Sequence, residues 1–144
     1  MVWRKALNLT RLFKPKTIAV IGGGEWCKSI MSAAHQIGYE GTILPIHPSG
    51  KEIAGVKSLK SLDAFPGFID AAFVGVNRHA TLDIVSKLST LNAGGATCFA
   101  SGFSEAAAED AIGANLQEKL IEAAGDMPIL GPNCYGFLNA FDKC

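Results

Sequence analysis

The stretch TIAVIGGGEWCKSIM, residues 17–31, joins an apolar run to three consecutive glycines and then to a helical pattern. Glycine permits a tight turn and close approach of the backbone to a ligand, and the free N–H groups at a helix start attract an anion. Gly22, Gly23 and Gly24 are therefore candidates for a phosphate-binding turn. A simple strand-to-helix turn without a ligand is the alternative for this segment.

The rest of the chain repeats the same alternation of short apolar runs and longer helical patterns. Runs that are apolar throughout are typical of parallel strands covered by helices on both faces, and repeats of this length indicate βαβ units. We therefore expect a single α/β domain over residues 1–144, with a Rossmann-like, doubly wound, mainly parallel sheet. The expected strands are 17–22, 42–48, 69–76, 96–100 and 127–131, and the expected helices are 27–38, 78–94 and 104–125.

Several local features complete this prediction. The first thirteen residues are expected to form a short helix or arm on the outside of the domain. The segment between the second and third strands, which contains Gly55, predicts a looser connection. Gly94 and Gly95 are expected to end a helix, as glycine commonly does, and Ser104 is expected to cap the next helix.

Composition excludes several classes of function. Thirteen basic and thirteen acidic residues cancel, so no overall field draws the chain to nucleic acid or to an anionic membrane. No apolar run approaches the roughly 18 residues that cross a bilayer, and the N-terminus has no signal-peptide pattern, so a cytoplasmic location is expected. The four cysteines are widely spaced, which fits reduced thiols better than disulfides or a zinc site. No residue pattern predicts a metal site or a catalytic group.

The glycine turn departs from the usual dinucleotide-binding pattern at two points. Cys27 stands where a third glycine is expected, and no carboxylate follows the second strand to hold the ribose hydroxyls of NAD. Lys51 follows that strand instead and could pair with an extra phosphate. This chemistry suits NADP or coenzyme A better than NAD, although Lys51 as a solvated surface lysine remains the alternative.

Five segments, IAVIGGG, GYEGTILPIHP, IDAAFVGV, FASGFSE and ILGPNCYGFLN, together resemble the CoA-binding domain of the NDP-forming acyl-CoA synthetases. This superfamily includes the succinyl-CoA synthetase alpha subunit. The resemblance runs from about Leu12 to Asn139, and its most specific piece is the G-P-N-C-x-G segment at 131–136. It implies coenzyme A, or an acyl-CoA, as the ligand.

The resemblance also implies roles for particular residues. The glycine turn wraps the CoA phosphates, with Gly24 in place of the usual small hydroxyl residue. The loop after the second strand borders the adenosine end, and Asn77 replaces the usual proline of the next loop. The segment after the fourth strand lies near the pantetheine arm, and the G-P-N-C segment lies near the thioester. The implied CoA-binding residues are Gly22, Gly23, Gly24, His47, Pro48, Lys51, Val76, Asn77, Ala100, Ser101, Gly102 and Asn133.

The family reaction joins a carboxylic acid to CoA while a nucleoside triphosphate is cleaved to the diphosphate. Its acyl phosphate and phosphohistidine intermediates require a further domain and an ATP-grasp module, which 144 residues do not accommodate. The resemblance thus implies a domain of a longer protein that binds CoA and catalyses nothing alone, with those modules in the same protein or in a partner subunit. A CoA-sensing domain fused to an acetyltransferase and an NAD(P)-binding oxidoreductase domain are the alternatives.

Other tempting residues have simpler interpretations. His35 lies in a helix pattern and is expected to be structural, whereas His79 opens a helix where a ligand contact is possible. Cys134 could lie close to the CoA sulfur, or it could fill a small apolar space. Cys27 at a helix start could have a lowered pKa or could stand in for a small residue, and Trp26 either covers the glycine turn or packs.

Overall fold

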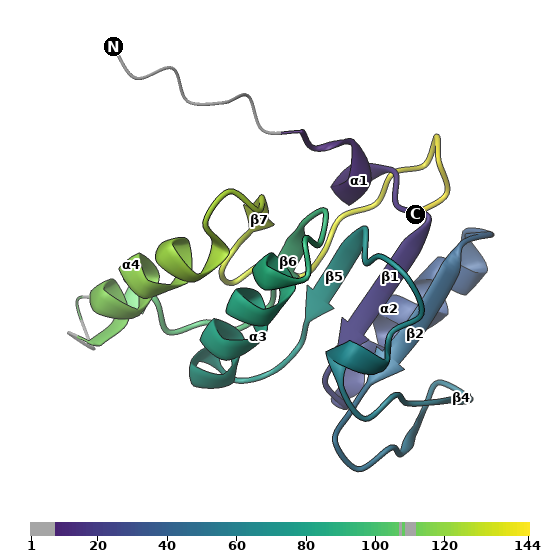
Figure 1. The fold of residues 1–144 in the computed structure, drawn as a ribbon, viewed down its shortest axis with the longest axis horizontal. Helices are drawn as coiled ribbons and strands as arrows, with labels where there is room; N and C mark the ends of the chain where they lie inside the picture. Colours follow the sequence, from purple (N-terminus) through teal and green to yellow (C-terminus); the bar gives the residue numbers. More distant parts are fainter. Residues whose placement is uncertain (1–7, 107, 109–111) are drawn as a thin grey trace.

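Five parallel strands form the central sheet of the computed structural model, which describes residues 8–106, 108 and 112–144. The strand order is β2-β1-β5-β6-β7, and each neighbouring pair is parallel (Figure 1). The predicted doubly wound, parallel α/β class is therefore confirmed. The strands are β1 (Thr17–Ile21), β2 (Thr42–Ile46), β5 (Ala71–Val74), β6 (Ala96–Cys98) and β7 (Ile129–Leu130).

Helices cover both faces of this sheet. Helix α2 (Glu25–Gln36) lies on one face, and α3 (Arg78–Thr90) and α4 (Ile112–Ala124) pack side by side on the other (Figure 1). The connection after β1 crosses to the first face, and the connection after β5 crosses to the second. The strand order thus reverses between β1 and β5, which is where ligands bind in open α/β sheets.

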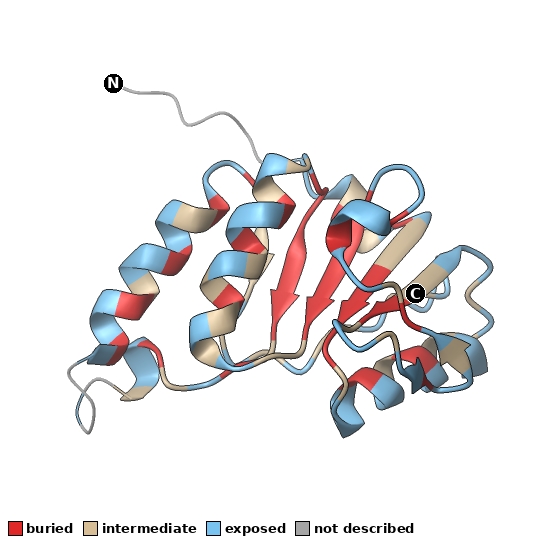
Figure 2. Ribbon diagram, turned by 60° about the horizontal axis from the view of Figure 1, so that its bottom comes forward, coloured by how far each residue is buried: buried red, intermediate tan, exposed pale blue. Residues whose placement is uncertain are grey.

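The core divides into two parts, one on each side of the sheet. Successive residues of a strand point to opposite faces, so Val20 packs with Cys27 and Met31 of α2. Ala19 and Ile21 pack instead with the cluster that includes α3 and α4. All four residues of β5 are buried, as Figure 2 shows for the centre of the sheet. This explains why the strand segments are apolar throughout.

The connection between β2 and β5 is more regular than predicted. It contains a hairpin of β3 (Glu52–Ile53) and β4 (Val56–Lys57), followed by a short 3-10 helix, η1 (Leu62–Ala64). Ala54 and Gly55 make the hairpin turn with positive φ angles of 49° and 79°. Strands of two residues are too short for a periodic pattern, which is why the sequence predicted only a loose segment.

The predicted helix at 104–125 was wrong in its first part. A 3-10 helix, η2 (Ser104–Ala106), comes first, Ala108 lies in a turn, and α4 begins at Ile112. Ser104 therefore begins η2 and does not cap the long helix. Residues 107 and 109–111 of the predicted helix lie outside the described residues.

The prediction that Gly94 and Gly95 end a helix was also wrong. Helix α3 ends at Thr90. The two glycines instead make room for α1 (Thr10–Phe13), because a Cβ on Gly95 would lie 3.0 Å from side-chain atoms of Leu12. The described part of the N-terminal segment is thus a short helix packed on the domain, as expected, whereas residues 1–7 lie outside the described residues.

Candidate functional site

The three glycines form the turn between β1 and α2 at the carboxyl edge of the sheet. Gly22 has a φ of +120°, and a Cβ there would collide with the main-chain oxygen of Gly75 in the loop after β5. The N–H of Gly22 donates to Ile46 at 3.1 Å, which ties the turn to β2. Gly24 is the N-cap of α2 in an extended conformation. The turn therefore lies at the switch point, with the first N–H groups of α2 beside it.

Gly23 lies beneath the loop that follows β2. The Nζ of Lys51 donates to the main-chain oxygen of Gly23 at 3.2 Å. A Cβ on Gly23 would lie 2.5 Å from Cε and Nζ of Lys51 and 2.8 Å from Cδ2 of His47. The structure thus brings His47 and Lys51, which are far from the glycines in the sequence, directly onto the turn.

The loop that carries His47 and Lys51 is held by its own hydrogen bonds. Nδ1 of His47 and Oγ of Ser49 lie 2.9 Å apart, and Gly50 donates its N–H to the oxygen of His47 at 2.9 Å. The hydroxyl of Ser58 donates to the main-chain oxygen of Lys51, which fixes the start of the hairpin. The position of Lys51 above the glycine turn is therefore set by the backbone of a structured loop.

A cavity of about 480 Å³ opens next to the turn, between the β2 loop and α3. Its lining includes five of the predicted residues: Gly22, Gly23, His47, Pro48 and Val76.

The same cavity has polar groups that the sequence did not predict. Lys60, Asp63 and Lys87 line it, and Nζ of Lys87 pairs with Oδ1 of Asp63 at 2.8 Å. The lysines come from two separate elements, and no local motif marks them. Because Asp63 balances the charge of Lys87, Lys60 in the cavity and Lys51 at the turn supply the net positive charge that suits an anion.

Asn77 follows Val76 of the cavity lining but is outside that lining, and its side chain has a structural role. Its Oδ1 accepts hydrogen bonds from the N–H groups of His79 at 3.1 Å and Ala80 at 2.9 Å, so it caps α3. His79 is exposed in the first turn of α3, and His35 is exposed in the last turn of α2, away from the carboxyl edge. The capping oxygen of Asn77 is thus already occupied by the protein.

The remaining predicted residues form a second group after β6 and β7. The N–H of Asn133 donates to the oxygen of Ala100 at 2.9 Å, which joins the two loops. Asn133 and Ser101 are exposed, and Gly102 has a φ of +90°. Arg78, which the sequence did not single out, donates to the oxygen of Gly102 at 2.8 Å. The four predicted residues of this group are outside the lining of the cavity at the glycine turn, farther along the same sheet edge. They are Ala100, Ser101, Gly102 and Asn133.

Two cysteines near this edge, Cys27 and Cys98, are buried, and burial makes them poor nucleophiles. Burial raises the pKa of Cys27, so a lowered pKa at this helix start is contradicted. Burial, with a smaller contribution from Cys134, raises the pKa of Cys98 to about 12. Among the described residues, no group of three His, Cys, Asp or Glu side chains could hold a metal ion, and no helix there is long and apolar enough to cross a bilayer.

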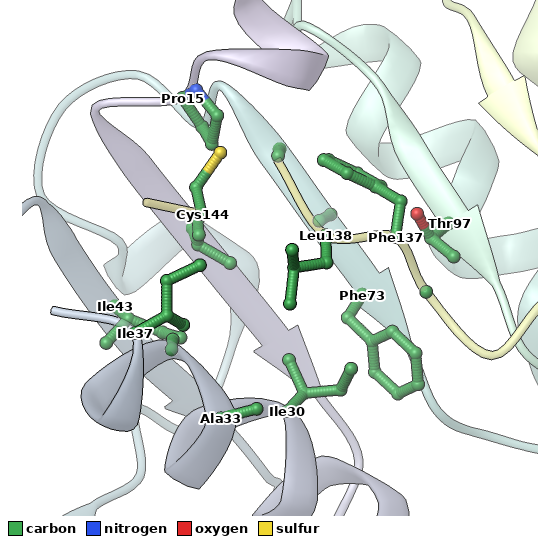
Figure 3. Close-up of a pocket in the computed structure, with 15 residues that line it drawn as sticks. Pro15, Ile30, Ala33, Ile37, Ile43, Phe73, Thr97, Phe137, Leu138 and Cys144 are labelled. Carbon is green, nitrogen blue, oxygen red and sulfur yellow. The ribbon is translucent and has the colours of Figure 1, made fainter. Parts of the chain in front are cut away.

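A second cavity, of about 100 Å³, lies between α2 and the segment at 136–144 (Figure 3). Ile30, Phe73 and Leu138 point into it, and its lining is almost entirely apolar. It lies over the face of the sheet, away from the glycine turn. A phosphorylated ligand has no charged partner there. The cavity at the turn is the candidate site because it opens at the carboxyl edge of the sheet, at the switch point in strand order.

Comparison with known proteins gives a consistent result. A family model described as a CoA binding domain matches residues 16–140. A trans-feruloyl-CoA synthase from an unknown prokaryotic organism is 31% identical over 140 residues, covering 94% of this chain and 20% of the relative. An ADP-forming acetate–CoA ligase of Archaeoglobus fulgidus is 31% identical over 137 residues, covering 91% of this chain and 19% of the relative. The chain thus spans about a fifth of the length of these relatives.

A solved structure is similar over the same region. The dinucleotide-forming acetyl-coenzyme A synthetase 1 of Ca. Korarchaeum cryptofilum has a TM-score of 0.83 and 29% sequence identity, covering 94% of this chain and 30% of that one. The sequence match and the fold match therefore agree with each other. They favour the synthetase interpretation over the oxidoreductase and acetyltransferase alternatives.

Proposed function

Because the family model covers most of its length, this chain belongs to the CoA-binding domain family, and we propose that it holds coenzyme A for an NDP-forming acyl-CoA synthetase. Its task is to bind CoA or an acyl-CoA and to orient the thiol toward an acyl phosphate. The carboxylic acid and the nucleotide are then handled by other parts of the full protein or by a partner subunit.

The observation that carries this proposal is the contact between Lys51 and Gly23. The Nζ of Lys51 lies 3.2 Å from the main-chain oxygen of Gly23, at the start of α2. A phosphate at this point meets one lysine charge together with the free N–H groups of the helix start. The diphosphate of CoA is the part of the ligand that we assign to it.

The adenosine end of CoA is assigned to the cavity beside the turn. His47 and Pro48 form its wall on the β2 side, and Lys60 adds a positive charge, whereas the charge of Lys87 is balanced by Asp63. CoA carries a phosphate on its ribose, so a cavity with cationic side chains suits it better than NAD. From this cavity, the rest of the CoA molecule extends along the carboxyl edge of the sheet.

The thiol end is assigned to the second group of residues. Asn133 and Ala100 are joined by a main-chain hydrogen bond of 2.9 Å, and both follow the carboxyl ends of neighbouring strands. The pantetheine arm passes Ala100, Ser101 and Gly102 and ends near Asn133. The side chain of Asn133 can present both a donor and an acceptor to the thioester or to the arm's last amide.

The names of the relatives support a proposal for the chemistry of the whole protein. They are named as ligases that join CoA to acetate, 4-hydroxybutyrate or ferulate, and two from Pyrococcus furiosus are named as alpha subunits. We propose that this chain works in the same way, in the cytoplasm, as one domain of a multidomain ligase. A phosphohistidine domain and an ATP-grasp module complete the reaction, so the chain alone binds CoA without turning it over.

Calorimetric titration of the 144-residue chain with CoA, NAD and NADP in parallel tests the proposal. Saturable binding of CoA alone is the expected result. Binding of NAD or NADP without any response to CoA overturns the proposal in favour of an oxidoreductase domain. The variant Lys51→Ala links the measured binding to the glycine turn, since it removes the charge while leaving the fold of the turn intact.

A further inference from the structure

Three aromatic rings from three different loops meet at the carboxyl edge of the sheet. Trp26 comes from the first turn of α2, Phe99 follows β6, and Tyr135 follows β7. The ring centroids of Trp26 and Tyr135 lie 5.0 Å apart, and Phe99 lies 5.6 Å from each of them. These residues, the aromatic cluster, are on the α2 side of the sheet, because Phe99 packs with the core beneath α2.

Two rings of the aromatic cluster are exposed to an unusual degree. Trp26 is 45% exposed and Tyr135 is 58% exposed, although both belong to a packed group. Large aromatic side chains are normally the most strongly buried parts of a core, and a cluster of them at the surface marks a place where something binds. The exposed surface of these two rings is therefore available to a ligand.

The aromatic cluster is nonetheless held firmly. Phe99 rests on the buried ring of Phe73 at a centroid distance of 6.1 Å. The N–H of Cys134 donates to the oxygen of Cys98 at 3.1 Å, which fixes the backbone next to Tyr135. On the other side, Gly136 lies against Ile30 of α2. Rings that are fixed before binding lose little conformational freedom when a ligand stacks on them.

We propose that Trp26, Tyr135 and Phe99 form a subsite for an aromatic ring in the acyl group carried by CoA, so that the acid used by the full protein is an aromatic carboxylic acid. This inference rests on the proposed function. Tyr135 comes two residues after Asn133, where the thiol end is assigned, and Trp26 comes two residues after Gly24, the last glycine of the turn. The acyl group attached to the thiol thus arrives beside the aromatic cluster.

The adenine of CoA is the other flat ring that the aromatic cluster could bind. Its assigned place is the cavity lined by His47, Pro48 and Lys60, on the α3 side of the glycine turn. The aromatic cluster is on the α2 side, next to the thiol end. One CoA molecule that follows the sheet edge reaches the cavity with its adenosine and the aromatic cluster with its acyl group.

The test compares cinnamoyl-CoA and benzoyl-CoA with acetyl-CoA and CoA. The chain has two tryptophans, Trp3 and Trp26, so the Trp3→Phe variant leaves Trp26 as the sole fluorescent indole. In this variant, the aromatic thioesters are expected to bind roughly three- to tenfold more tightly than acetyl-CoA. They are also expected to change the Trp26 emission, which acetyl-CoA leaves nearly unchanged.

Two substitutions locate the effect, and a third serves as the control. Trp26→Ala, and separately Tyr135→Ala, should remove the preference for the aromatic thioesters while leaving the affinity for CoA unchanged. Phe68→Ala removes another exposed aromatic ring, 74% exposed and just before β5 at the opposite edge of the sheet, and should keep the preference. Circular dichroism of each variant verifies that it is folded.

The outcomes separate this inference from the proposed function. If CoA binds but the aromatic thioesters bind no more tightly than acetyl-CoA, the aromatic subsite is overturned and the proposed function stands. If both Trp26→Ala and Tyr135→Ala weaken CoA as much as cinnamoyl-CoA, the rings hold the adenine and the subsite is again overturned. If CoA itself does not bind, the proposed function fails and the subsite fails with it.

Discussion

The side-chain nitrogen of Lys51 lies 3.2 Å from the main-chain oxygen of Gly23, so the loop after β2 reaches over the glycine turn after β1. This contact joins the glycine turn to a loop 28 residues later in the chain, and no single sequence motif includes both. It also places a positive charge where the helix start of α2 already favours an anion. The two features together support the proposed phosphate site more strongly than three glycines alone.

Replacing Lys51 with alanine is expected to weaken CoA binding about tenfold without unfolding the chain. A charge-assisted hydrogen bond to a phosphate contributes about 1.5–3 kcal/mol to the binding free energy. For an exposed lysine we expect a contribution at the lower end of this range. Titration calorimetry at several salt concentrations measures the effect. The affinity of the variant should also depend less on salt, because one ionic contact with the ligand is lost.

The control for Lys51 is Lys57→Ala in the same hairpin. Lys57 is exposed on β4, outside the lining of the cavity and away from the glycine turn. Its removal should leave the affinity for CoA within a factor of two. An equal loss in both variants would mean that the hairpin merely supplies general positive charge and that Lys51 has no special position.

The glycines of the turn are expected to respond very differently to substitution. Gly22→Ala should lower the free energy of unfolding by roughly 2–4 kcal/mol, because Gly22 has a φ of +120° and its Cβ would collide with the backbone of Gly75. Gly24→Ser should be neutral or stabilise by about 0.5 kcal/mol, since Gly24 is an N-cap with open space around it. Urea denaturation of both variants measures the difference.

Gly23→Ala separates binding from stability. The Cβ would meet the ends of two flexible side chains, Lys51 and His47, rather than backbone. Both side chains can move aside, so the chain should remain folded while Lys51 leaves the turn. CoA binding weakened about tenfold, as in Lys51→Ala, with a stability change below about 1 kcal/mol, is expected. Retained binding in this variant would show that the position of Lys51 is unimportant.

The sequence was informative where function depends on neighbours in the chain. The turn from Gly22 to Gly24 joins one strand to one helix, so its place at the sheet edge follows from the order of these two elements. The position of Asn133 at the carboxyl edge could be predicted because it comes three residues after the end of the last strand. The parallel sheet was predictable because buried strands must be apolar on both faces.

Residues brought together by packing could not be predicted in the same way. Lys60 and Lys87 line one cavity, but they come from a loop and from the last turn of a helix, without a common motif. Gly94 and Gly95 matched the usual end of a helix, whereas their actual neighbours, Arg11 and Leu12, lie about 80 residues away in the sequence. Steric demands of this kind are set by distant elements, so a local pattern cannot reveal them.

The attachment of α1 is expected to make stability depend on pH. Nε of Arg11 lies 2.7 Å from Oδ1 of Asp70, and the N–H of Lys16 donates to Oδ2 at 2.9 Å. Burial by itself raises the pKa of Asp70, but these hydrogen bonds and the charge of Arg11 outweigh it, so the pKa is lowered overall. The stabilisation is therefore present above the ordinary carboxyl pKa, near 4, and is lost as pH falls through the folded-state value.

Asp70→Asn should accordingly lower the free energy of unfolding by about 1–2 kcal/mol at pH 7, with a smaller difference at pH 3. Urea denaturation across this range gives the comparison. Lys28→Gln, which breaks an exposed pair with Glu25, is the control and should change stability by less than about 0.5 kcal/mol. A loss for Asp70→Asn that is the same at both pH values would contradict the role assigned to its charge.

The four thiols differ in burial, and this difference is expected to control their reactivity. Cys27 and Cys98 are buried, with exposures of 1% and 0%, and burial raises the pKa of Cys98 to about 12. Cys134 and Cys144 are half-buried. Burial and the nearby charge of Asp142 raise the pKa of Cys144. The thiolate is the reactive form, so this raised pKa slows the reaction of Cys144.

Iodoacetamide at pH 8 is therefore expected to modify Cys134 first, Cys144 more slowly, and Cys27 and Cys98 only after unfolding. Peptide mapping by mass spectrometry gives the order, and labelling in guanidinium chloride shows that all four thiols can react. Because the thiol end of CoA is assigned next to Asn133, saturating CoA should slow the modification of Cys134 several-fold while leaving Cys144, at the opposite edge of the sheet near Phe13, unchanged. Equal protection of both cysteines would indicate general stabilisation of the fold, and no protection of Cys134 would place the thiol elsewhere.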